Sequence, residues 1–217
     1  MSVNTEAARH QMVTQQVRAW EVLDPTVLRV LSEVPRERFV PPAYRSLAFA
    51  DTAIPLPHGQ HLLTPQVAGR ILQALEIGAD DHVLEVGTGS GFLTACLGRL
   101  AGRVTSLEIN PELADMARRN LRDVGATNCE VLTEDVFQWR PTGPFNGIAV
   151  TGSIPMFHPR FQDWLADGGR LFLAVGPGPA MDAWLIRRAG REFIRESLFE
   201  TVLPALSNAV QPDPFQF

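Results

Sequence analysis

The stretch that decides the fold of this chain is an apolar run that ends in three alternating glycines: Val83-Leu84-Glu85-Val86-Gly87-Thr88-Gly89-Ser90-Gly91-Phe92. The Val- and Leu-rich run predicts a short buried strand, and the glycines predict a tight turn into a helix. Such a turn lets a ligand approach backbone N–H groups closely. Taken alone the pattern is a weak signal, because a tight turn without a ligand uses the same residues.

Strand-like and helix-like segments alternate after this turn. We predict strands at 82–86, 103–107, 129–133, 146–151 and 170–175, with a turn at Asp167-Gly168-Gly169 just before the last of them. Segments of about ten residues or more separate these strands, as crossovers between parallel strands require. Two further extended runs, 182–188 and 192–199, flank Ala189-Gly190 and predict a hairpin. The fold class is therefore α/β, a doubly wound, mostly parallel sheet with an antiparallel edge.

The region before the sheet is helical and rich in proline, and no clear strand is expected between Thr5 and Glu76. Asp24-Pro25, Thr64-Pro65 and Asn110-Pro111 predict helix starts, since each pairs an N-cap residue with proline at the first helical position. We divide the chain into a helical N-terminal region (1–78) that packs on the core and carries a substrate loop, a core (79–207), and a tail (208–217). The tail is expected to be disordered or loosely attached, and the whole to form one structural domain.

Composition narrows the class of protein. The 217 residues carry a net charge of −5, which argues against a nucleic-acid partner because phosphate binding needs a basic face. The N-terminal segment has no apolar signal core, and the uncharged stretch 141–159 is interrupted by proline and glycine. Cys96 and Cys129 form neither a disulfide framework nor a zinc motif. We expect a cytoplasmic monomer with no metal, no membrane association and no bound nucleic acid.

Three acidic residues mark the ends of the first three predicted strands. Glu85 lies two residues before the first glycine, Glu108 follows the second strand, and Asp135 follows the third. Carboxyl ends of parallel strands meet at the ligand-binding edge of an open α/β sheet, so the three carboxylates should share a site. A carboxylate at position 85 would repel pyrophosphate but suits the cationic amino-acid end of S-adenosylmethionine. Glu108 could accept hydrogen bonds from both ribose hydroxyls, and Asp135 one from the adenine amino group.

A nicotinamide oxidoreductase is the competing interpretation of the glycine turn. The dinucleotide fingerprint GxGxxG would need its third glycine at the position that Phe92 occupies. S-adenosylmethionine is therefore the cofactor we expect. The residues predicted to bind it are Glu85, Gly87, Thr88, Gly89, Ser90, Gly91, Glu108, Ile109, Asp135, Val136 and Thr151.

With these motifs in place, the chain resembles the protein-L-isoaspartate O-methyltransferases over roughly residues 10–200. The segment 34–41 (VPRERFVP) is similar to the family's VPRxxFVP, and 12–17 (MVTQQV) to its opening helix. Other similar segments are 48–51 to AYxD, 59–60 to GQ, 145–155 to FDAIIVTAAAP and 165–176 to LKPGGRLVxPVG. The resemblance implies methyl transfer from S-adenosylmethionine to the free carboxylate of an isoaspartyl residue in a protein or peptide.

The departures from the family pattern fall in the acceptor site. The family's substrate loop reads TIS, one residue, then Pro, whereas this chain has His61-Leu62-Leu63-Thr64-Pro65. The serine expected to contact the acceptor carboxylate is therefore Leu63, which has no donor. Thr64 offers a neighbouring hydroxyl, although we favour it as a helix cap. An arginine of the family's RFVPL segment is also missing, since this chain reads TVLPAL at 201–206.

The acceptor site is nevertheless expected in this loop, and its predicted residues are His58, Gln60, His61, Leu62, Leu63 and Gln66. His58 and His61 suggest a metal site, but no third ligand stands at motif spacing, so lining the acceptor pocket is the favoured role. No residue is assigned a catalytic role beyond the two candidates Leu63 and Thr64. Two alternatives stay open: the same cofactor with another, more apolar small-molecule acceptor, and a degenerate family member that binds without turnover.

Overall fold

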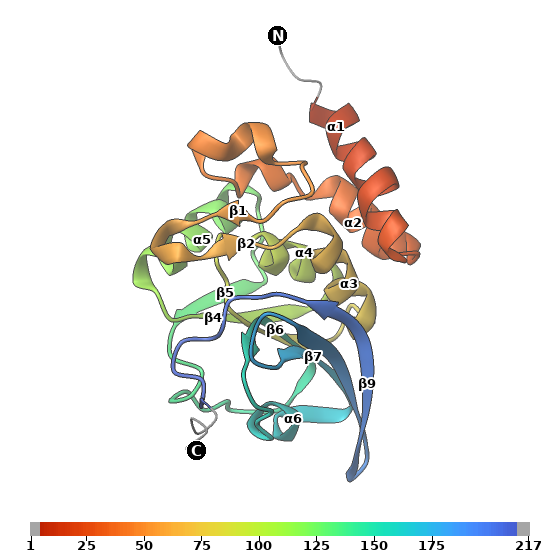
Figure 1. Cartoon of the computed structure of the whole chain (residues 1–217), viewed down its shortest axis with the longest axis vertical. Helices are drawn as coiled ribbons and strands as arrows, with labels where there is room; N and C mark the ends of the chain where they lie inside the picture. The colour runs from red at the N-terminus through yellow and green to blue at the C-terminus, as the bar shows by residue number, and fades with distance from the viewer. Residues whose placement is uncertain (1–4, 212–217) are drawn as a thin grey trace.

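The computed structural model describes residues 5–211, and its dominant feature is a seven-stranded sheet in the order β5-β4-β3-β6-β7-β8-β9 (Figure 1). The first five strands of that order run parallel, and β8 and β9 follow as antiparallel strands. This is the predicted α/β fold with an antiparallel edge. The strands are β3 (His82–Val86), β4 (Arg103–Glu108), β5 (Cys129–Thr133), β6 (Phe145–Ile154), β7 (Leu165–Val175), β8 (Met181–Ala189) and β9 (Glu192–Thr201).

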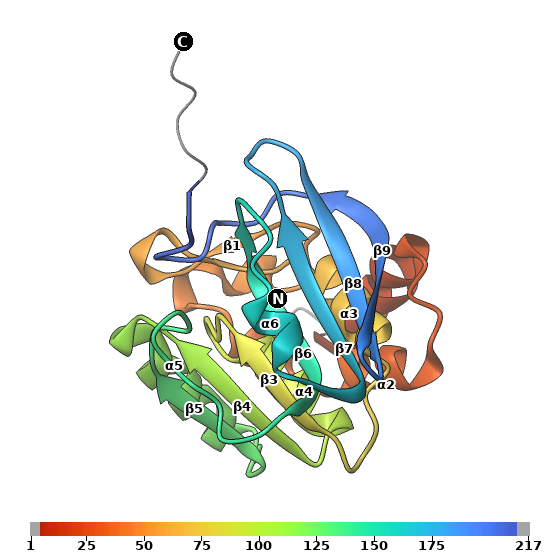
Figure 2. The same ribbon diagram turned by 90° about the horizontal axis from the view of Figure 1, so that it is seen from below.

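Helices cover both faces of this sheet, with α3, α4 and α5 on one face and α6 on the other (Figures 1 and 2). The helices are α1 (Thr5–Gln11), α2 (Pro25–Glu33), α3 (Pro65–Leu75), α4 (Phe92–Leu100), α5 (Pro111–Asp123) and α6 (Arg160–Asp163). Shorter helical turns are η1 (Met12–Val17), η2 (Arg18–Trp20), η3 (Arg36–Arg38), η4 (Pro42–Leu47) and η5 (Pro57–Gly59). Within residues 5–211, no helix is long and apolar enough to cross a membrane.

The three predicted helix starts are confirmed. The Asp24 side chain accepts hydrogen bonds from the N–H groups of residues 26 and 27 at the start of α2. Thr64 accepts one from Val67 N at the start of α3, and Asn110 accepts two from residues 112 and 113 at the start of α5. Each cap satisfies N–H groups that have no partner within the helix, which explains why the helices begin there.

Two expectations about strands were wrong. The N-terminal region does contain strands, since β1 (Ile54–Pro55) and β2 (His61–Leu62) pair antiparallel as a two-stranded sheet. Two-residue strands have no periodicity to recognise, so the sequence does not reveal them. The turn expected at 167–169 lies inside β7, which begins at Leu165 and shifts its register against β6 between Phe145 and Gly147. Gly168, with φ +75°, allows this irregularity within the strand.

The expectation of a loosely attached tail was also wrong for the part that the structure describes. Asn208 donates a hydrogen bond to Asp135, and Ala209 is buried in the core on the α6 side of the sheet. The rest of the predicted tail, 212–217, lies outside the described residues. The segment after β9 is attached to the sheet because Ala205 pairs with Ser153 of β6, a residue far away in the sequence.

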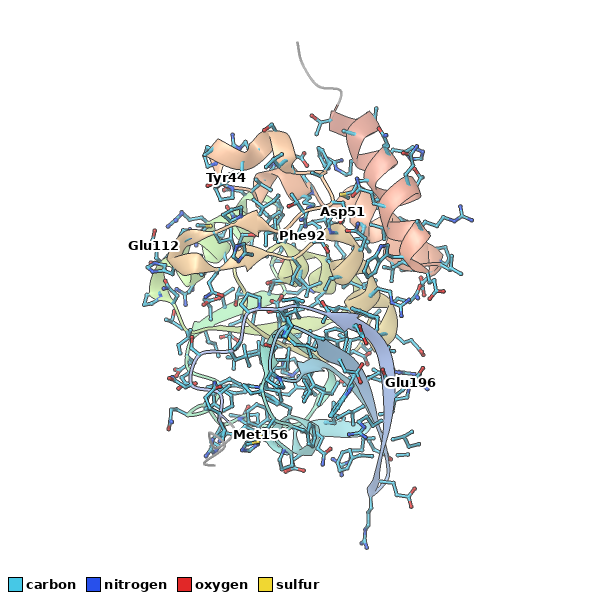
Figure 3. All side chains as sticks on the ribbon, in the orientation of Figure 1. Tyr44, Asp51, Phe92, Glu112, Met156 and Glu196 are labelled. Atoms are coloured by element: carbon cyan, nitrogen blue, oxygen red, sulfur yellow. The ribbon has the colours of Figure 1, made fainter. Side chains whose placement is uncertain are left out.

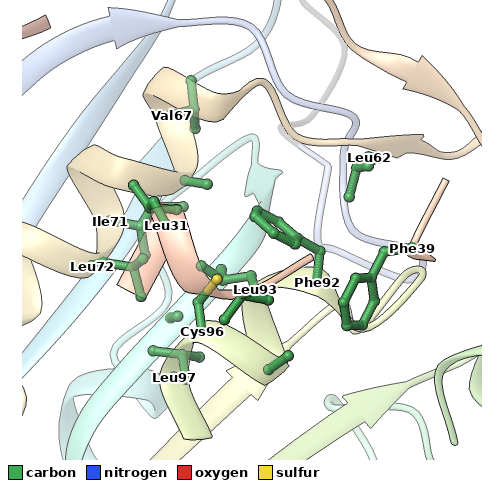
Figure 4. Packing of buried hydrophobic residues seen from close by; sticks show 14 of the residues in the cluster. Leu31, Phe39, Leu62, Val67, Ile71, Leu72, Phe92, Leu93, Cys96 and Leu97 are labelled. Carbon is green, nitrogen blue, oxygen red and sulfur yellow. The ribbon is translucent and has the colours of Figure 1, made fainter. Parts of the chain in front are cut away.

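Side chains that alternate along the strands belong to two buried hydrophobic clusters, one on each face of the sheet. Val83 joins the cluster that contains α3, α4 and the N-terminal region, whereas Leu84 joins the cluster around α6. In the first cluster Phe39 and Phe92 pack edge to face with ring centroids 5.7 Å apart (Figure 4). The N-terminal region is thereby packed on the helix that follows the glycine turn.

Candidate active site

A cavity of about 830 Å³ lies at the carboxyl edge of the large sheet. The ends of β3, β4, β6 and β9 contribute to its wall, together with the loop from residue 56 to 64 and the segment from 200 to 207. The end of β9 reaches this edge because β8 and β9 each reverse direction, which makes β9 run the same way as β7. The cavity therefore gathers residues from the whole length of the chain.

The glycine turn forms one wall of the cavity and is held in a conformation that suits glycine. Gly87, Gly89 and Gly91 have φ values of +95°, +55° and +89°. A Cβ atom built on Gly87 would lie 2.4 Å from Thr151 Oγ1, so no side chain fits there. Thr151 Oγ1 lies 2.9 Å from Val86 O and 2.8 Å from Gly87 O, which ties β6 to the turn.

Glu108 braces the turn from the end of β4. Its Oε2 accepts a hydrogen bond from Gly89 N at 2.9 Å, and its Oε1 accepts one from Asn110 N at 3.0 Å. The residue is buried, yet it lines the cavity. A carboxylate can accept about four hydrogen bonds, so these two donors leave accepting capacity toward the cavity.

Glu85 is fully buried at the base of the cavity. Its Oε2 accepts hydrogen bonds from Thr94 Oγ1 and Ser106 Oγ, while its Oε1 has no partner among residues 5–211. Burial raises the pKa of Glu85 to about 7, and the hydrogen bonds from Ser106 and Thr94 oppose that rise. A buried carboxylate oxygen without a partner is costly, and a cationic group in the cavity would relieve that cost. This fits the ammonium group of a bound amino acid.

Asp135 lies on the side of the cavity nearest β5. Its Oδ1 accepts a hydrogen bond from Phe137 N at 2.8 Å, and its Oδ2 accepts one from Asn208 Nδ2 at 3.0 Å. Val136 beside it is buried, and Ile109 after β4 is 42% exposed and lines the same cavity. An apolar surface beside a carboxylate suits an aromatic ring that carries an amino group.

The structure brings together nearly all of the residues predicted to bind the cofactor. Every one of them except Gly91 lines the cavity. Gly91 is instead the N-cap of α4 and packs against α5, where an added Cβ atom would lie 3.3 Å from Ala117 Cβ. Position 91 requires glycine because its φ is positive and because α5 packs closely against it.

The predicted substrate loop also lines the cavity, with the exception of Gln66, which is buried in α3. Thr64 lines the cavity while its hydroxyl caps α3, as expected. His58 adopts a left-handed conformation with φ +59°, and its Nε2 lies 2.8 Å from Glu112 Oε2 at the start of α5. Glu112 stands at the outer end of α5 beside the β1–β2 segment, so this contact joins the loop to the start of α5 (Figure 3).

The conformation of the loop at Leu63 depends on Arg36, a residue of the VPRERFVP segment. Arg36 is buried, and its Nη2 and Nε donate hydrogen bonds to Leu63 O at 2.7 Å and to Ala48 O at 2.9 Å, respectively. Its guanidinium lies over the Phe92 ring, 4.7 Å from the centroid. Burial lowers the pKa of Arg36 to about 10. This side chain links the N-terminal region, the loop and α4.

Sequence reasoning missed several residues that line the cavity, some of them from segments far from the glycine turn. Trp20 and Val202 are 44% and 69% exposed and contribute apolar surface near the loop. The departure of residues 201–206 (TVLPAL) from the family pattern pointed to that segment, but no signal in the sequence placed Trp20 beside it. The missed polar and apolar lining residues include Trp20, Asp51, Glu134, Glu200, Val202 and Leu206.

The charged side chains that line the cavity are acidic. The acidic residues that line it are Asp51, Glu85, Glu108, Glu134, Asp135 and Glu200, and no arginine of residues 5–211 lines it. His58 and His61 are the lining residues that can become cationic. His58 already contacts Glu112, whereas the His61 imidazole is exposed and makes no hydrogen bond to another described residue. The acidic lining suits a cationic ligand. The His61 side chain in this lining remains available to bind an anionic group. No group of three potential metal ligands occurs in residues 5–211.

Comparisons with known proteins agree with this geometry. Residues 7–207 match the family model described as protein-L-isoaspartate(D-aspartate) O-methyltransferase. Relatives named protein-L-isoaspartate O-methyltransferase from Methanoculleus marisnigri and Koribacter versatilis are 39% and 38% identical over 185 residues each. The first alignment covers 84% of this chain and 84% of the relative, and the second covers 84% and 83%.

A solved structure from Plasmodium falciparum, assigned to the protein-L-isoaspartate O-methyltransferases and in complex with S-adenosyl-L-homocysteine, has the same fold. It superposes with a TM-score of 0.78 at 20% identity, over 92% of this chain and 98% of the other. A second structure, named protein-L-isoaspartate O-methyltransferase, gives a TM-score of 0.81 at 20% identity over 94% and 67%. At this identity the likeness establishes the fold.

Proposed function

Because this chain belongs to the protein-L-isoaspartate O-methyltransferase family, we propose that it transfers a methyl group from S-adenosylmethionine to the free carboxylate of an isoaspartyl residue in a protein or peptide. The observation that carries the proposal is the glycine turn together with Glu85 and Glu108 in one cavity at the carboxyl edge of the sheet. When bound, S-adenosylmethionine supplies a methyl group on a sulfonium that is itself the leaving group.

Three carboxylates would hold the cofactor along this edge. The unpartnered Oε1 of Glu85 suits its ammonium group, Glu108 its ribose hydroxyls, and Asp135 its adenine amino group. The positive-φ glycines let the backbone approach the ligand without a Cβ atom in the way. The acidic wall attracts the two positive charges of the cofactor.

The reaction at the acceptor needs no general base from this chain. A carboxylic acid with an ordinary pKa of about 4 is already ionised at neutral pH, so the enzyme's main task is alignment. Gln60, Leu62 and the Leu63 segment would form the wall against which the acceptor lies. In the absence of the family serine, the side chains of Gln60 and His61, which both line the cavity, offer donors that could hold the acceptor carboxylate.

A second candidate function keeps the cofactor and changes the acceptor. Leu63 replaces a donor, and Leu62, Trp20 and Val202 add apolar surface to the same part of the cavity. A more apolar small molecule would fit this wall. The third possibility, a family member without turnover, predicts binding of the cofactor and no methyl transfer.

One assay separates these functions. Labelled S-adenosylmethionine is offered with an isoaspartyl peptide and with its aspartyl twin of the same sequence. Transfer to the isoaspartyl peptide alone supports the first function, and the label on the peptide should be lost in mild base, as a methyl ester is. Cofactor binding without that transfer favours the second or third function, which a screen of small-molecule acceptors then divides.

For assembly and location we propose a cytoplasmic monomer that acts on damaged proteins and binds no nucleic acid. The net charge of −5 supports the last point. Gel filtration at several protein concentrations and fractionation of cells test the other two.

A further inference from the structure

The segment after β9 crosses the carboxyl edge of the sheet, and we call residues 203–209 the C-terminal strap (Figure 2). Ser153 in β6 anchors it: Ser153 N donates to Pro204 O at 2.8 Å, Leu206 N donates to Ser153 O at 2.8 Å, and Ser153 Oγ donates to Leu203 O at 3.0 Å. At the other end Ala209 is 7% exposed and belongs to the core. The strap is therefore fixed at two points across the edge of the cavity.

Asn208 stands between these anchors and reaches Asp135. It adopts a left-handed conformation with φ +64°, which asparagine tolerates better than most residues. Its Nδ2 donates to Asp135 Oδ2 at 3.0 Å, while Phe137 N donates to Asp135 Oδ1 at 2.8 Å. Each carboxylate oxygen thus has one donor, and both oxygens retain accepting capacity.

Two donors on opposite oxygens decide the orientation of a carboxylate that could otherwise rotate about its χ2 bond. An ionised carboxylate is an acceptor only. A carboxylate held in this way can receive the exocyclic amino group of adenine. It would repel the 6-oxo group of hypoxanthine, which presents an acceptor at the same position.

We propose that Asn208 is a positioning residue of the cofactor site: it orients the Asp135 carboxylate for the adenine amino group and so contributes to the choice of a 6-amino purine. This inference rests on the proposed function, because it takes S-adenosylmethionine as the cofactor and Asp135 as its adenine contact. A merely structural role for Asn208, as a tether of the strap, would affect all purine ligands alike.

The test uses Asn208→Gly, since glycine accepts positive φ and the change removes the donor without straining the backbone. Binding of S-adenosylhomocysteine and of S-inosylhomocysteine, its 6-oxo analogue, is measured by calorimetry. Loss of this support should weaken S-adenosylhomocysteine binding roughly fivefold to tenfold, which is less than the loss of a direct hydrogen bond to a charged group because Asn208 acts through Asp135. Binding of S-inosylhomocysteine should stay unchanged. Asn208→Asp places a second carboxylate beside Asp135 and should weaken S-adenosylhomocysteine binding further.

Gln211→Ala is the matched control, because among residues 5–211 the Gln211 side chain donates one hydrogen bond, to Ala209 O, and has none with Asp135. Its affinity for both ligands should equal that of the unaltered protein. Equal weakening of both ligands by Asn208→Gly, or no change in either, would overturn the inference while the proposed function stands. Failure of the unaltered protein to bind S-adenosylhomocysteine would overturn both. A thermal melt of each variant confirms that it is folded.

Discussion

Arg36 and Leu63 are joined by a hydrogen bond of 2.7 Å from the guanidinium Nη2 to the backbone oxygen, across 27 positions of sequence. The bond ties the VPRERFVP segment to the residue that replaces the family serine. A backbone contact of this kind places position 63 whatever its side chain is. The side chain at position 63 can therefore change while the backbone keeps its place in the cavity wall.

Arg36→Met should lower the free energy of unfolding by about 2–4 kcal/mol, because the buried Ala48 carbonyl and the partly buried Leu63 carbonyl lose their donor and Met cannot replace it. The loss should appear in urea denaturation, with a smaller effect on cofactor affinity than on KM for the acceptor. Arg38→Ala is the control in the same segment, since Arg38 makes one exposed hydrogen bond to Asp123 O. Equal stability of Arg36→Met and the unaltered protein would contradict this role.

Leu63→Ser should increase methylation of an isoaspartyl peptide. A hydrogen bond to a charged group contributes roughly 1.5–3 kcal/mol, so the ceiling is on the order of tenfold to a hundredfold in kcat/KM. We expect a partial gain, because residues 201–206 also line the cavity and differ from the family. Leu63 packs against the buried core, so a thermal melt must accompany the kinetics. A folded variant that binds cofactor without any gain would favour the different-acceptor function.

Glu108→Ala should weaken binding of S-adenosylhomocysteine by about 1–3 kcal/mol, through lost hydrogen bonds to a charged acceptor. Part of the loss arises from the turn, since Gly89 N and Asn110 N lose their common partner. Calorimetry measures the change. Glu130→Ala, at an exposed position of β5 away from the cavity, should leave the affinity unaltered. An unchanged affinity in Glu108→Ala would remove this residue from the cofactor site.

Glu85 should make stability and affinity respond to pH in opposite directions. Its folded-state pKa of about 7 lies above the ordinary 4.5, so the folded protein holds a proton that the unfolded chain releases between those values. Stability therefore falls as pH rises from 4.5 to 7, by up to roughly 3 kcal/mol, and levels off above 7. Affinity for a ligand with an ammonium group should rise over pH 6–8 as Glu85 ionises.

Glu85→Gln tests both directions, because the amide keeps the shape but does not titrate. Denaturation at pH 5 and pH 7.5 should show a smaller stability difference in the variant than in the unaltered protein. Calorimetry with S-adenosylhomocysteine should show a flatter pH dependence of affinity. Identical pH profiles for the two proteins would show that Glu85 does not hold the proton.

Much of the fold could be predicted because its signals are local. An N-cap residue before proline acts over one helical turn, and the caps at Asp24, Thr64 and Asn110 all lie where expected. Apolar runs likewise marked the strands of the large sheet. Strands β1 and β2 were not predicted because two residues are too few to show an alternating pattern. The start of β7 was not predicted because Gly168 lies within a strand, whereas glycine usually indicates a turn.

The residues on the glycine-turn side of the cavity could be predicted from the sequence. The glycine turn, Glu85 and Glu108 lie on consecutive strands, and the geometry of a parallel sheet brings consecutive carboxyl ends to one edge. The residues on the opposite side, around the predicted substrate loop, come together only in the tertiary structure. Trp20 and Glu200 meet around the substrate loop only because β9 returns to that edge and the N-terminal region packs on α3 and α4. The Asn208 contact with Asp135 likewise spans 73 positions, a separation over which no periodicity or cap carries information.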